Sequence, residues 1–369
     1  MLAFGRWASR RARPKIEDIR GEIMDNGFLS AKENISGNDI VLEVKDLIVH
    51  YVLKSETVGA VNNVSFNLKS GRAMGLVGET GAGKTTTALS IMNLVPKPPG
   101  VIKSGVIDVC GSKMLQLNQR QLSNIRGKDI SMIFQDPMTS LNPVVPVGDQ
   151  IAESVFLHEN LSKNKAFDRA VEMLELVGIP GIRAKEYPHQ FSGGMKQRVL
   201  IAIALACNPQ VLIADEPTTA LDVTIQAQVL DMMNDLKTKF NTALIMITHD
   251  LGVVAKMCDE VAVMYAGRIV ESGTLEDVFD STMHPYTEGL FNSLPNLDNR
   301  EADLKPIPGM MPDPTKLPKG CAFAPRCLYA TGACTEKALE LRHISDTHTV
   351  LCSAYDEPGF HIEGWQYNG

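Results

Sequence analysis

The chain has 369 residues, of which 44% are hydrophobic and 21% are charged, and its formal net charge is −7. At roughly 150 residues per domain, this length predicts two domains, or one large domain with an appendage. The hydrophobic share excludes a wholly disordered chain. A strongly basic nucleic-acid-binding protein is also excluded, because the isoelectric point is about 5.7.

Residues 1–39 predict a polar leader. It carries four arginines between positions 6 and 13 but no apolar core like that of a secretory signal, so we expect a reducing compartment. The leader is either a solvated tail or a basic arm that touches anionic lipid or a partner, since Phe4 and Trp7 stand beside the arginines. No apolar run reaches the ~18 residues of a membrane-spanning helix; the most apolar, residues 199–207, is closed by Asn208-Pro209.

Strand-like and helix-like segments alternate from residue 40 onward. Strands are predicted at Ile40–Val44, Leu47–Tyr51, Asn63–Leu68, Ala73–Val77, Val211–Ala214 and Ala243–Ile247. The third alternates apolar and polar residues, as a half-buried antiparallel strand does, whereas the last two are continuous apolar runs typical of a parallel sheet. Helices are predicted from the glycine-rich turn to Leu94, within residues 151–178, and over Gln226–Phe240. This alternation predicts an α/β domain with a mostly parallel sheet.

The composition changes beyond Pro285. Prolines recur from Pro295 to Pro318 and predict an extended connector of about 25 residues, followed by a small C-terminal module. This module contains four of the seven cysteines: Cys321, Cys327, Cys334 and Cys352. Their spacing, C-x5-C-x6-C-x17-C, matches neither ferredoxins nor zinc ribbons. The residues alone leave a structural metal site and inert thiols equally open.

The strongest chemical motif is a complete G-x-x-x-x-G-K-[ST] loop. It lies between a predicted strand and a predicted helix and reads Gly78-Glu79-Thr80-Gly81-Ala82-Gly83-Lys84-Thr85. Glycines let the backbone wrap an anion, and the helix N-terminus supplies positive potential. We expect Lys84 to reach the outer phosphates of a nucleotide and the Thr85 hydroxyl to enter a Mg²⁺ shell.

Two further segments complement this loop. Asp215-Glu216 ends a buried apolar strand, where Asp215 would hold Mg²⁺ and Glu216 would polarise the attacking water. Ser192-Gly193-Gly194 begins a predicted helix, and its hydroxyl and free N–H groups form a second candidate anion site. The sequence therefore predicts two phosphate-binding sites in the chain.

Together these motifs resemble those of ATP-binding cassette (ABC) ATPases over about residues 40–275. Gln135 is similar to the family's Q-loop, Ala220-Leu221-Asp222 to its D-loop, and His249 to its switch histidine. Tyr51 stands where the family places an aromatic ring on adenine, and Thr86 follows the phosphate loop. The resemblance implies a P-loop NTPase (RecA-like) core in residues 40–290, with an antiparallel β subdomain and a helical subdomain at about 136–190. Residues 291–369 would hold the connector and the cysteine-containing module.

The resemblance also implies a mechanism. Two cassettes would pair head to tail, so that Ser192, Gly193 and Gly194 contact the ATP held by the partner's phosphate loop. His249 would hold the γ-phosphate and orient Glu216, and Gln135 would join Thr85 and Asp215 around Mg²⁺. Met195 stands where the common signature has Gln, yet Glu216 and His249 predict a cassette competent in hydrolysis.

A finer resemblance points to the peptide-import branch. It rests on Gln135–Pro143, Val147–Ile151, Tyr187–Met195, His284–Thr287 and the segment that begins at Leu317. It implies the first of two ATPase subunits of an oligopeptide or dipeptide importer, on the cytoplasmic face of the membrane. The partners would be a second ATPase subunit, two membrane permeases and an extracytoplasmic binding protein, without nucleic acid. Similar cysteine-containing tails are associated with a [4Fe-4S] cluster, and zinc is the next choice.

Two alternatives have discriminating features. An importer of the same branch for nickel–chelator complexes, glutathione or oligosaccharides would share these motifs, because the binding protein and permeases read the cargo. A soluble ABC ATPase acting on ribosomes or DNA would be expected to join two cassettes or insert a long coiled coil, and this sequence has one cassette and no such insert. Copurification with membrane proteins would separate importers from the soluble class.

Overall fold

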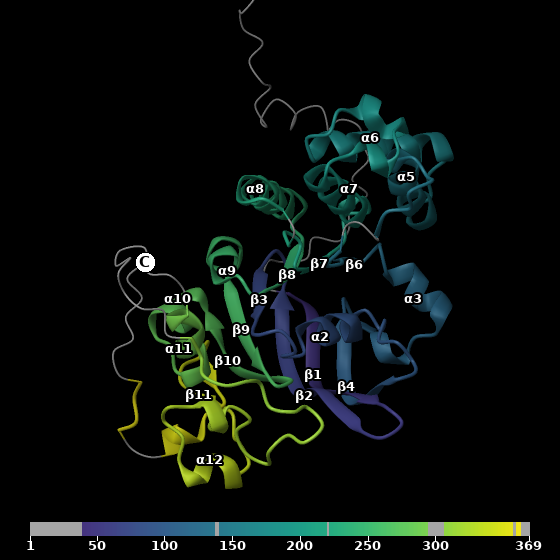
Figure 1. The fold of residues 1–369 in the computed structure, drawn as a ribbon. Helices are drawn as coiled ribbons and strands as arrows, with labels where there is room; N and C mark the ends of the chain where they lie inside the picture. Colours follow the sequence, from purple (N-terminus) through teal and green to yellow (C-terminus); the bar gives the residue numbers. More distant parts are fainter. Residues whose placement is uncertain (1–38, 137–139, 220, 294–305, 357–358, 363–369) are drawn as a thin grey trace, which may run out of the picture. The chain divides into compact units, whose positions relative to one another are not determined.

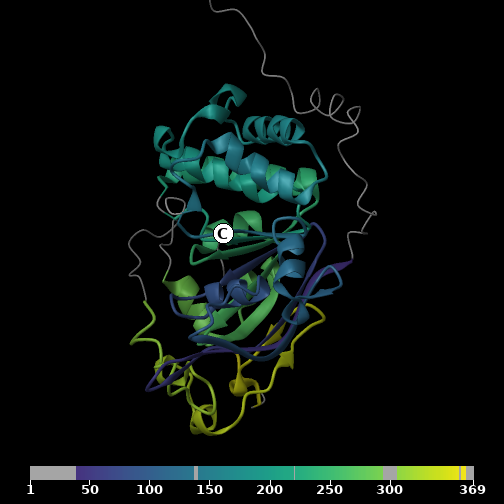
Figure 2. The same ribbon diagram turned by 90° about the vertical axis from the view of Figure 1, so that its right-hand side faces the viewer.

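The computed structural model describes residues 39–136, 140–219, 221–293, 306–356 and 359–362. The predicted leader, except Asp39, lies outside the described residues, as do Ala220 and much of the predicted connector. Two sheets organise the described chain (Figures 1 and 2). None of the described helices is long and apolar enough to cross a lipid bilayer.

The larger sheet has eight strands and mixed direction. In spatial order the strands are β11 (Arg342–His343), β12 (Thr349–Val350), β10 (Arg268–Thr274), β9 (Glu260–Tyr265), β3 (Ala73–Val77), β8 (Ala243–Thr248), β7 (Val211–Asp215) and β6 (Ile130–Ile133). The five strands from β9 to β6 run parallel to one another, and the remaining pairings are antiparallel. Every residue of β3, β7 and β8 is buried. The apolar runs predicted as parallel strands are thus confirmed.

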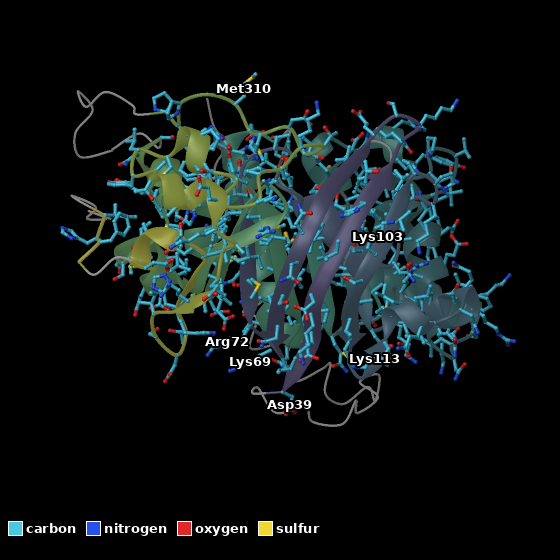
Figure 3. All side chains as sticks on the ribbon, turned by 90° about the horizontal axis from the view of Figure 1, so that it is seen from below. Asp39, Lys69, Arg72, Lys103, Lys113 and Met310 are labelled. Atoms are coloured by element: carbon cyan, nitrogen blue, oxygen red, sulfur yellow. The ribbon has the colours of Figure 1, made fainter. Side chains whose placement is uncertain are left out.

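The smaller sheet is antiparallel. Its strands, in spatial order, are β2 (Thr57–Lys69), β1 (Ile40–Val52), β4 (Gly100–Val109) and β5 (Ser112–Lys113). The two strands predicted at 40–51 are one strand, because a register shift between Val44 and Leu47 lets β1 continue past Asp46, whose φ is 48°. The outer face of this sheet carries polar side chains such as Lys103 on β4 (Figure 3).

The described helices lie against the sheets and in a separate helical layer (Figure 1). They are α2 (Lys84–Ile91), α3 (Gln119–Ile125), α5 (Val147–His158), α6 (Lys163–Leu176), α7 (Gly193–Leu205), α8 (Val223–Phe240), α9 (Leu251–Met257), α10 (Leu275–Asp280), α11 (Pro285–Asn292) and α12 (Gly332–Glu336). Short 3-10 turns are η1 (Met114–Gln116), η2 (Gly181–Lys185), η3 (Pro188–Gln190), η4 (Ala324–Arg326) and η5 (Ser353–Asp356). The helical stretch predicted within 151–178 is two helices, because the chain breaks after His158 and Ser162 caps α6.

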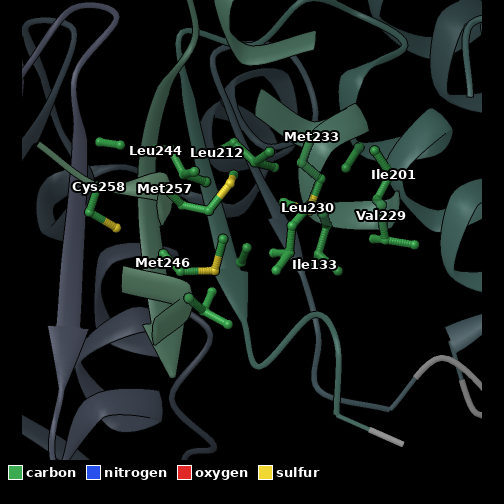
Figure 4. Packing of buried hydrophobic residues seen from close by; sticks show 14 of the residues in the cluster. Ile133, Ile201, Leu212, Val229, Leu230, Met233, Leu244, Met246, Met257 and Cys258 are labelled. Atoms are coloured by element: carbon green, nitrogen blue, oxygen red, sulfur yellow. The ribbon is translucent and has the colours of Figure 1, made fainter. Parts of the chain in front are cut away.

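The main core lies between the parallel strands and α7, α8 and α9. Met246 and Leu212 from the sheet, Met233 from α8 and Met257 from α9 are among its buried side chains (Figure 4). The unbranched methionines fill irregular gaps between helices and sheet. This packing fixes the carboxyl ends of β3, β7 and β8, where the predicted chemical residues follow.

The C-terminal region continues the larger sheet. Strand β12 pairs with β10, and Leu351 donates its backbone N–H to Val270 O at 2.8 Å. The predicted module is therefore joined to the core by sheet hydrogen bonds, a contact that the proline-rich composition did not predict.

Candidate active site

The phosphate loop joins β3 to α2, as its motif predicts. Gly78 and Gly83 have φ of 148° and 102°, and a Cβ on them would lie 2.2 Å from Met264 O and 2.4 Å from Ala60 O. Only glycine fits both the dihedral angles and this close backbone approach. No side chain caps the N-terminus of α2, so its first N–H groups are left for another acceptor. An anion is the acceptor that such a helix end favours.

Lys84 lies inside this loop. Its Nζ donates to Gly78 O at 2.6 Å and to Glu79 O at 3.0 Å, and the residue is 7% exposed. Burial lowers the pKa of Lys84, while the nearby Glu216 and Asp215 carboxylates act in the opposite direction. The ammonium group is thus placed between the loop carbonyls and the acidic end of β7.

Asp215 is the last residue of β7 and is 3% exposed. Burial raises the pKa of Asp215, and a hydrogen bond from the Thr85 side chain partly offsets this effect. The structure thus brings together Thr85 and Asp215, the two residues predicted to serve one cation. A buried carboxylate beside a hydroxyl is a donor set that suits Mg²⁺.

Glu216 is the centre of a hydrogen-bond network. Gln135 Nε2 donates to Glu216 Oε2 at 2.8 Å, Thr219 Oγ1 donates to the same oxygen at 3.0 Å, and His249 Nδ1 lies 3.1 Å from Oε1. Burial acts to raise the pKa of Glu216, but these bonds, with His249 first, hold it below its ordinary value. Two predicted catalytic residues, Gln135 and His249, therefore converge on the ionised carboxylate of the third, Glu216.

The sequence reasoning missed Thr219. The local sequence could have pointed to Thr219, because a hydroxyl three residues after an acidic residue at a strand end can hydrogen-bond to its carboxylate. The φ of Glu216 is 47°, and its N–H donates to Ile247 O of β8 at 2.8 Å. This turn directs the carboxylate toward His249, which follows β8.

Tyr51 lies near the phosphate loop at the end of β1. Its hydroxyl is 3.4 Å from Thr86 Oγ1 in α2, and the residue is half-buried. The antiparallel sheet thus delivers an aromatic side chain to the helix that begins at Lys84.

Ser192, Gly193, Gly194 and Asp222 form a second group at the starts of α7 and α8. Ser192 Oγ accepts from Met195 N at 3.4 Å, and Asp222 Oδ1 accepts from Ile225 N at 3.0 Å. A Cβ on Gly194 would lie 2.5 Å from Ile225 Cγ2, so this glycine lets the two helix starts pack closely. Helix α7 lies with α5 and α6, away from α2 (Figures 1 and 2). The structure therefore does not bring this group to the chain's own phosphate loop.

Four cysteines and His284 line one small cavity in the C-terminal region. We call it the cysteine cavity; its thiols belong to Cys321, Cys327, Cys334 and Cys352. Burial raises the pKa of Cys327 to about 11 and that of Cys352 to about 12. His284 Nε2 is buried there without a hydrogen-bond partner, while His284 Nδ1 accepts from Tyr286 N at 3.0 Å.

The cysteine cavity satisfies part of what a metal centre requires. Four soft sulfur ligands and one unpartnered imidazole nitrogen suit a thiophilic metal group. Across the residues that the structure describes, however, no three His, Cys, Asp or Glu side chains are arranged so that they could hold a metal ion. The predicted [4Fe-4S] cluster or zinc ion thus has the right residues around one cavity, but these side chains do not form a preformed ligand set.

The chain is similar to known transporter ATPases. A family profile described as "ABC transporter" matches residues 61–219, and one described as "Oligopeptide/dipeptide transporter, C-terminal region" matches residues 270–334. The oligopeptide transport ATP-binding protein OppD of Bacillus subtilis is 53% identical, covering 84% of this chain and 87% of that relative. The dipeptide transport ATP-binding protein DppD of the same organism is 49% identical, covering 87% and 96%.

A solved structure with the same fold is a dimer. It is the ATP-binding cassette MJ0796 in a post-hydrolysis state bound to ADP and Pi, with a TM-score of 0.57 and 27% identity. The match covers 63% of this chain and 98% of that one. The predicted P-loop NTPase fold with an antiparallel sheet subdomain is confirmed. The chain therefore belongs to the ABC transporter family, as one of the ATPases that carry the oligopeptide/dipeptide transporter C-terminal region.

Proposed function

We propose that this chain binds and hydrolyses ATP to power the import of oligopeptides or dipeptides through a membrane ABC permease. The observation that carries the proposal is the convergence of Gln135, Thr219 and His249 on the Glu216 carboxylate. Relatives of about half-identical sequence named for oligopeptide and dipeptide transport support the cargo class.

In this proposal the phosphate loop holds the nucleotide. Backbone N–H groups of the loop Gly78–Thr86 would donate to the phosphates, except those of Glu79 and Ala82, which already donate to the Tyr286 hydroxyl and to Glu79 O. Lys84 supplies the positive charge, and Tyr51 packs against the adenine. Thr85, Asp215 and Gln135 would hold Mg²⁺, which neutralises developing charge on the phosphates.

Glu216 acts as the base that orients and polarises the attacking water. It is suited to this role because His249, Thr219 and Gln135 favour its charged form. His249 contributes twice, since its Nδ1 faces Glu216 and its ring is available to a terminal phosphate. Most of the rate gain then comes from positioning and charge stabilisation.

The second group of residues acts on a partner. Ser192, Gly193, Gly194 and Asp222 lie away from this chain's loop, so we infer that they complete the nucleotide site of a second ATPase subunit. The dimeric arrangement of MJ0796 supports this inference. Two permeases and an extracytoplasmic binding protein complete the assembly, and the chain is attached to the cytoplasmic face of the membrane through the permeases.

We assign residues 40–290 to the ATPase domain, about 136–190 to the helical subdomain that receives the permeases, and 291–369 to the connector and C-terminal region. The four thiols of the cysteine cavity are the proposed ligands of a [4Fe-4S] cluster, with zinc as the alternative. The visible absorbance of anaerobically purified protein distinguishes the two. Import of nickel–chelator complexes, glutathione or oligosaccharides remains the alternative cargo.

The test is Glu216→Gln in the complex reconstituted with its permeases. We expect MgATP binding to persist, ATP hydrolysis to fall about 100-fold or more, and peptide uptake to stop with it. Glu43→Gln is the matched control, because Glu43 pairs with Lys45 on β1, outside both the nucleotide site and the helical subdomain. Peptide uptake at the normal rate in the Glu216→Gln complex would refute the assigned hydrolytic role.

A further inference from the structure

A residue of the phosphate loop is held by the C-terminal region. Arg326 Nη1 donates to Glu79 Oε2 at 2.7 Å, and Arg326 Nη2 donates to Glu79 Oε1 at 3.0 Å. The two residues are 247 positions apart, and the Arg326 side chain is 5% exposed. A bidentate, largely buried arginine–carboxylate pair has fixed geometry as well as high energy. Glu79 is therefore fixed in position by a partner outside the ATPase core.

Arg326 is itself held firmly. Its Nε donates to Pro308 O at 2.8 Å, and its Nη1 also reaches the Tyr265 hydroxyl at 3.3 Å. The Glu79 carboxylate raises the pKa of Arg326, so the guanidinium keeps its charge. These contacts hold the Arg326 side chain in one position, unlike a flexible side chain on the surface.

A second contact fixes the backbone of the same loop residue. Glu79 N donates to the Tyr286 hydroxyl of α11 at 2.8 Å. The Tyr286 ring packs on Tyr265 and Phe323, with ring centroids 4.5 and 5.4 Å apart. Glu79 is thus fixed at both its amide and its carboxylate by residues beyond position 285.

The same segments form the cysteine cavity. Arg326 ends η4, between Cys321 and Cys327, and His284 caps α11 two residues before Tyr286. All three side chains that flank these contacts, Cys321, Cys327 and His284, line the cavity. A change in the packing of the cavity therefore displaces one or both partners of Glu79.

Displacing Glu79 would change the nucleotide site. Glu79 O and Gly78 O both accept from Lys84 Nζ, so the position of Glu79 decides where the lysine ammonium lies. A preorganised loop binds phosphates more tightly, because the ordering cost is already met when the ligand arrives.

We propose that Arg326 is a positioning residue for the phosphate loop, and that through Glu79 it couples the cysteine cavity to nucleotide binding. The inference rests on the proposed function in one respect, that MgATP binds at Gly78–Thr86. Coupling of this kind is reciprocal. If the contacts of the C-terminal region with Glu79 strengthen nucleotide binding, bound nucleotide must stabilise those contacts by the same free energy.

The first test compares MgATP affinity in the full chain. Arg326→Gln should weaken binding about tenfold, and Arg326→Lys less, because lysine keeps the charge but loses the bidentate geometry. Arg342→Gln is the matched control: Arg342 pairs with Asp356 in the same C-terminal region. It should bind MgATP as the wild type does. Glu79→Gln combined with Arg326→Gln should weaken binding by less than the product of the single effects.

The second test measures the effect of bound MgATP on the cysteine cavity. Alkylation of Cys327 is followed by mass spectrometry with and without MgATP, in protein treated with a chelator so that no metal group shields the thiol, and the exposed Cys110 serves as the internal reference. We expect MgATP to slow the labelling of Cys327 in the wild type and in Arg342→Gln. The protection should be lost in Arg326→Gln and reduced in Arg326→Lys. A purely structural role of Arg326 would lower the melting temperature without removing this protection in folded protein.

The outcomes separate the two proposals. If the wild-type chain bound no MgATP, the proposed function would fail and the coupling with it. If the wild type bound MgATP but folded Arg326→Gln and Arg326→Lys bound it equally well, the coupling alone would be overturned. Should Arg326→Gln not fold, Arg326→Lys decides the question by itself.

Discussion

Single residues of the phosphate loop are constrained by contacts with distant backbone. Gly83 combines a φ of 102° with a Cβ direction blocked by Ala60 O at 2.4 Å. Gly111, in the turn between β4 and β5, has a φ of 82° but open space around the same position. The two glycines therefore separate the cost of dihedral strain from the cost of a steric clash.

We predict that Gly111→Ala lowers the free energy of unfolding by about 1–2 kcal/mol, the cost of a left-handed non-glycine residue, and leaves ATP hydrolysis unchanged. Gly83→Ala should cost more, because the clashing atom is backbone, and should lower hydrolysis about 100-fold by displacing Lys84. Urea unfolding and steady-state ATPase assays measure both. Normal hydrolysis by Gly83→Ala would show that the close approach of Ala60 O does not constrain the phosphate loop.

Helices meet at the starts of α7 and α8, where the residues proposed to face the partner subunit lie. The Ile225 methyl group that blocks a Cβ on Gly194 belongs to a β-branched side chain, which cannot turn away easily. Gly193, one residue earlier, has nothing within 4 Å of its Cβ direction. The glycine pair thus contains one residue required by packing and one that packing does not require.

Gly194→Ala should therefore lower the free energy of unfolding by about 1–3 kcal/mol through overpacking. Gly193→Ala should leave it unchanged or raise it by up to about 1 kcal/mol, because alanine favours the helix. Urea denaturation followed by circular dichroism gives both values. Equal effects of the two substitutions would show that α8 does not constrain this helix start.

At the scale of the whole molecule, the C-terminal region and the ATPase core share buried polar contacts. Glu271 on β10 is 1% exposed and accepts from Met283 N, His284 N and His348 Nε2. These bonds join the larger sheet to α11 and to the turn before β12. Beside them, burial lowers the pKa of His284 from 6.5 to about 3.

This depressed pKa predicts a pH dependence of stability. Between pH 6.5 and about 3 the unfolded chain binds a proton at His284 that the folded chain does not. The free energy of unfolding should therefore decrease as the pH is lowered from 6.5 to about 3. This group contributes up to about 1.4 kcal/mol per pH unit to the decrease. His284→Asn keeps a capping side chain and should remove this contribution. Urea titrations at several pH values measure the free energy of unfolding of both proteins. If this free energy depended on pH equally in the wild type and in His284→Asn, the prediction would be disproved.

The sequence by itself determined the local features. These are the apolar strands β3, β7 and β8, the glycine-rich loop, and the choice of Lys84, Asp215 and Glu216 as candidate site residues. These follow from periodicity and from conformations that particular residues alone can adopt, which are properties of short segments. Its errors were also local, as in β1, where a bulge looked like a break between two strands.

Only the tertiary structure decided which distant groups meet. Gln135 met Glu216, and Arg326 and Tyr286 came to hold Glu79. The unpartnered nitrogen of His284 was placed in the cysteine cavity. Hydrogen bonds between residues more than 200 positions apart depend on how sheets and helices pack, and that packing is set by burial of the whole apolar surface rather than by any one motif.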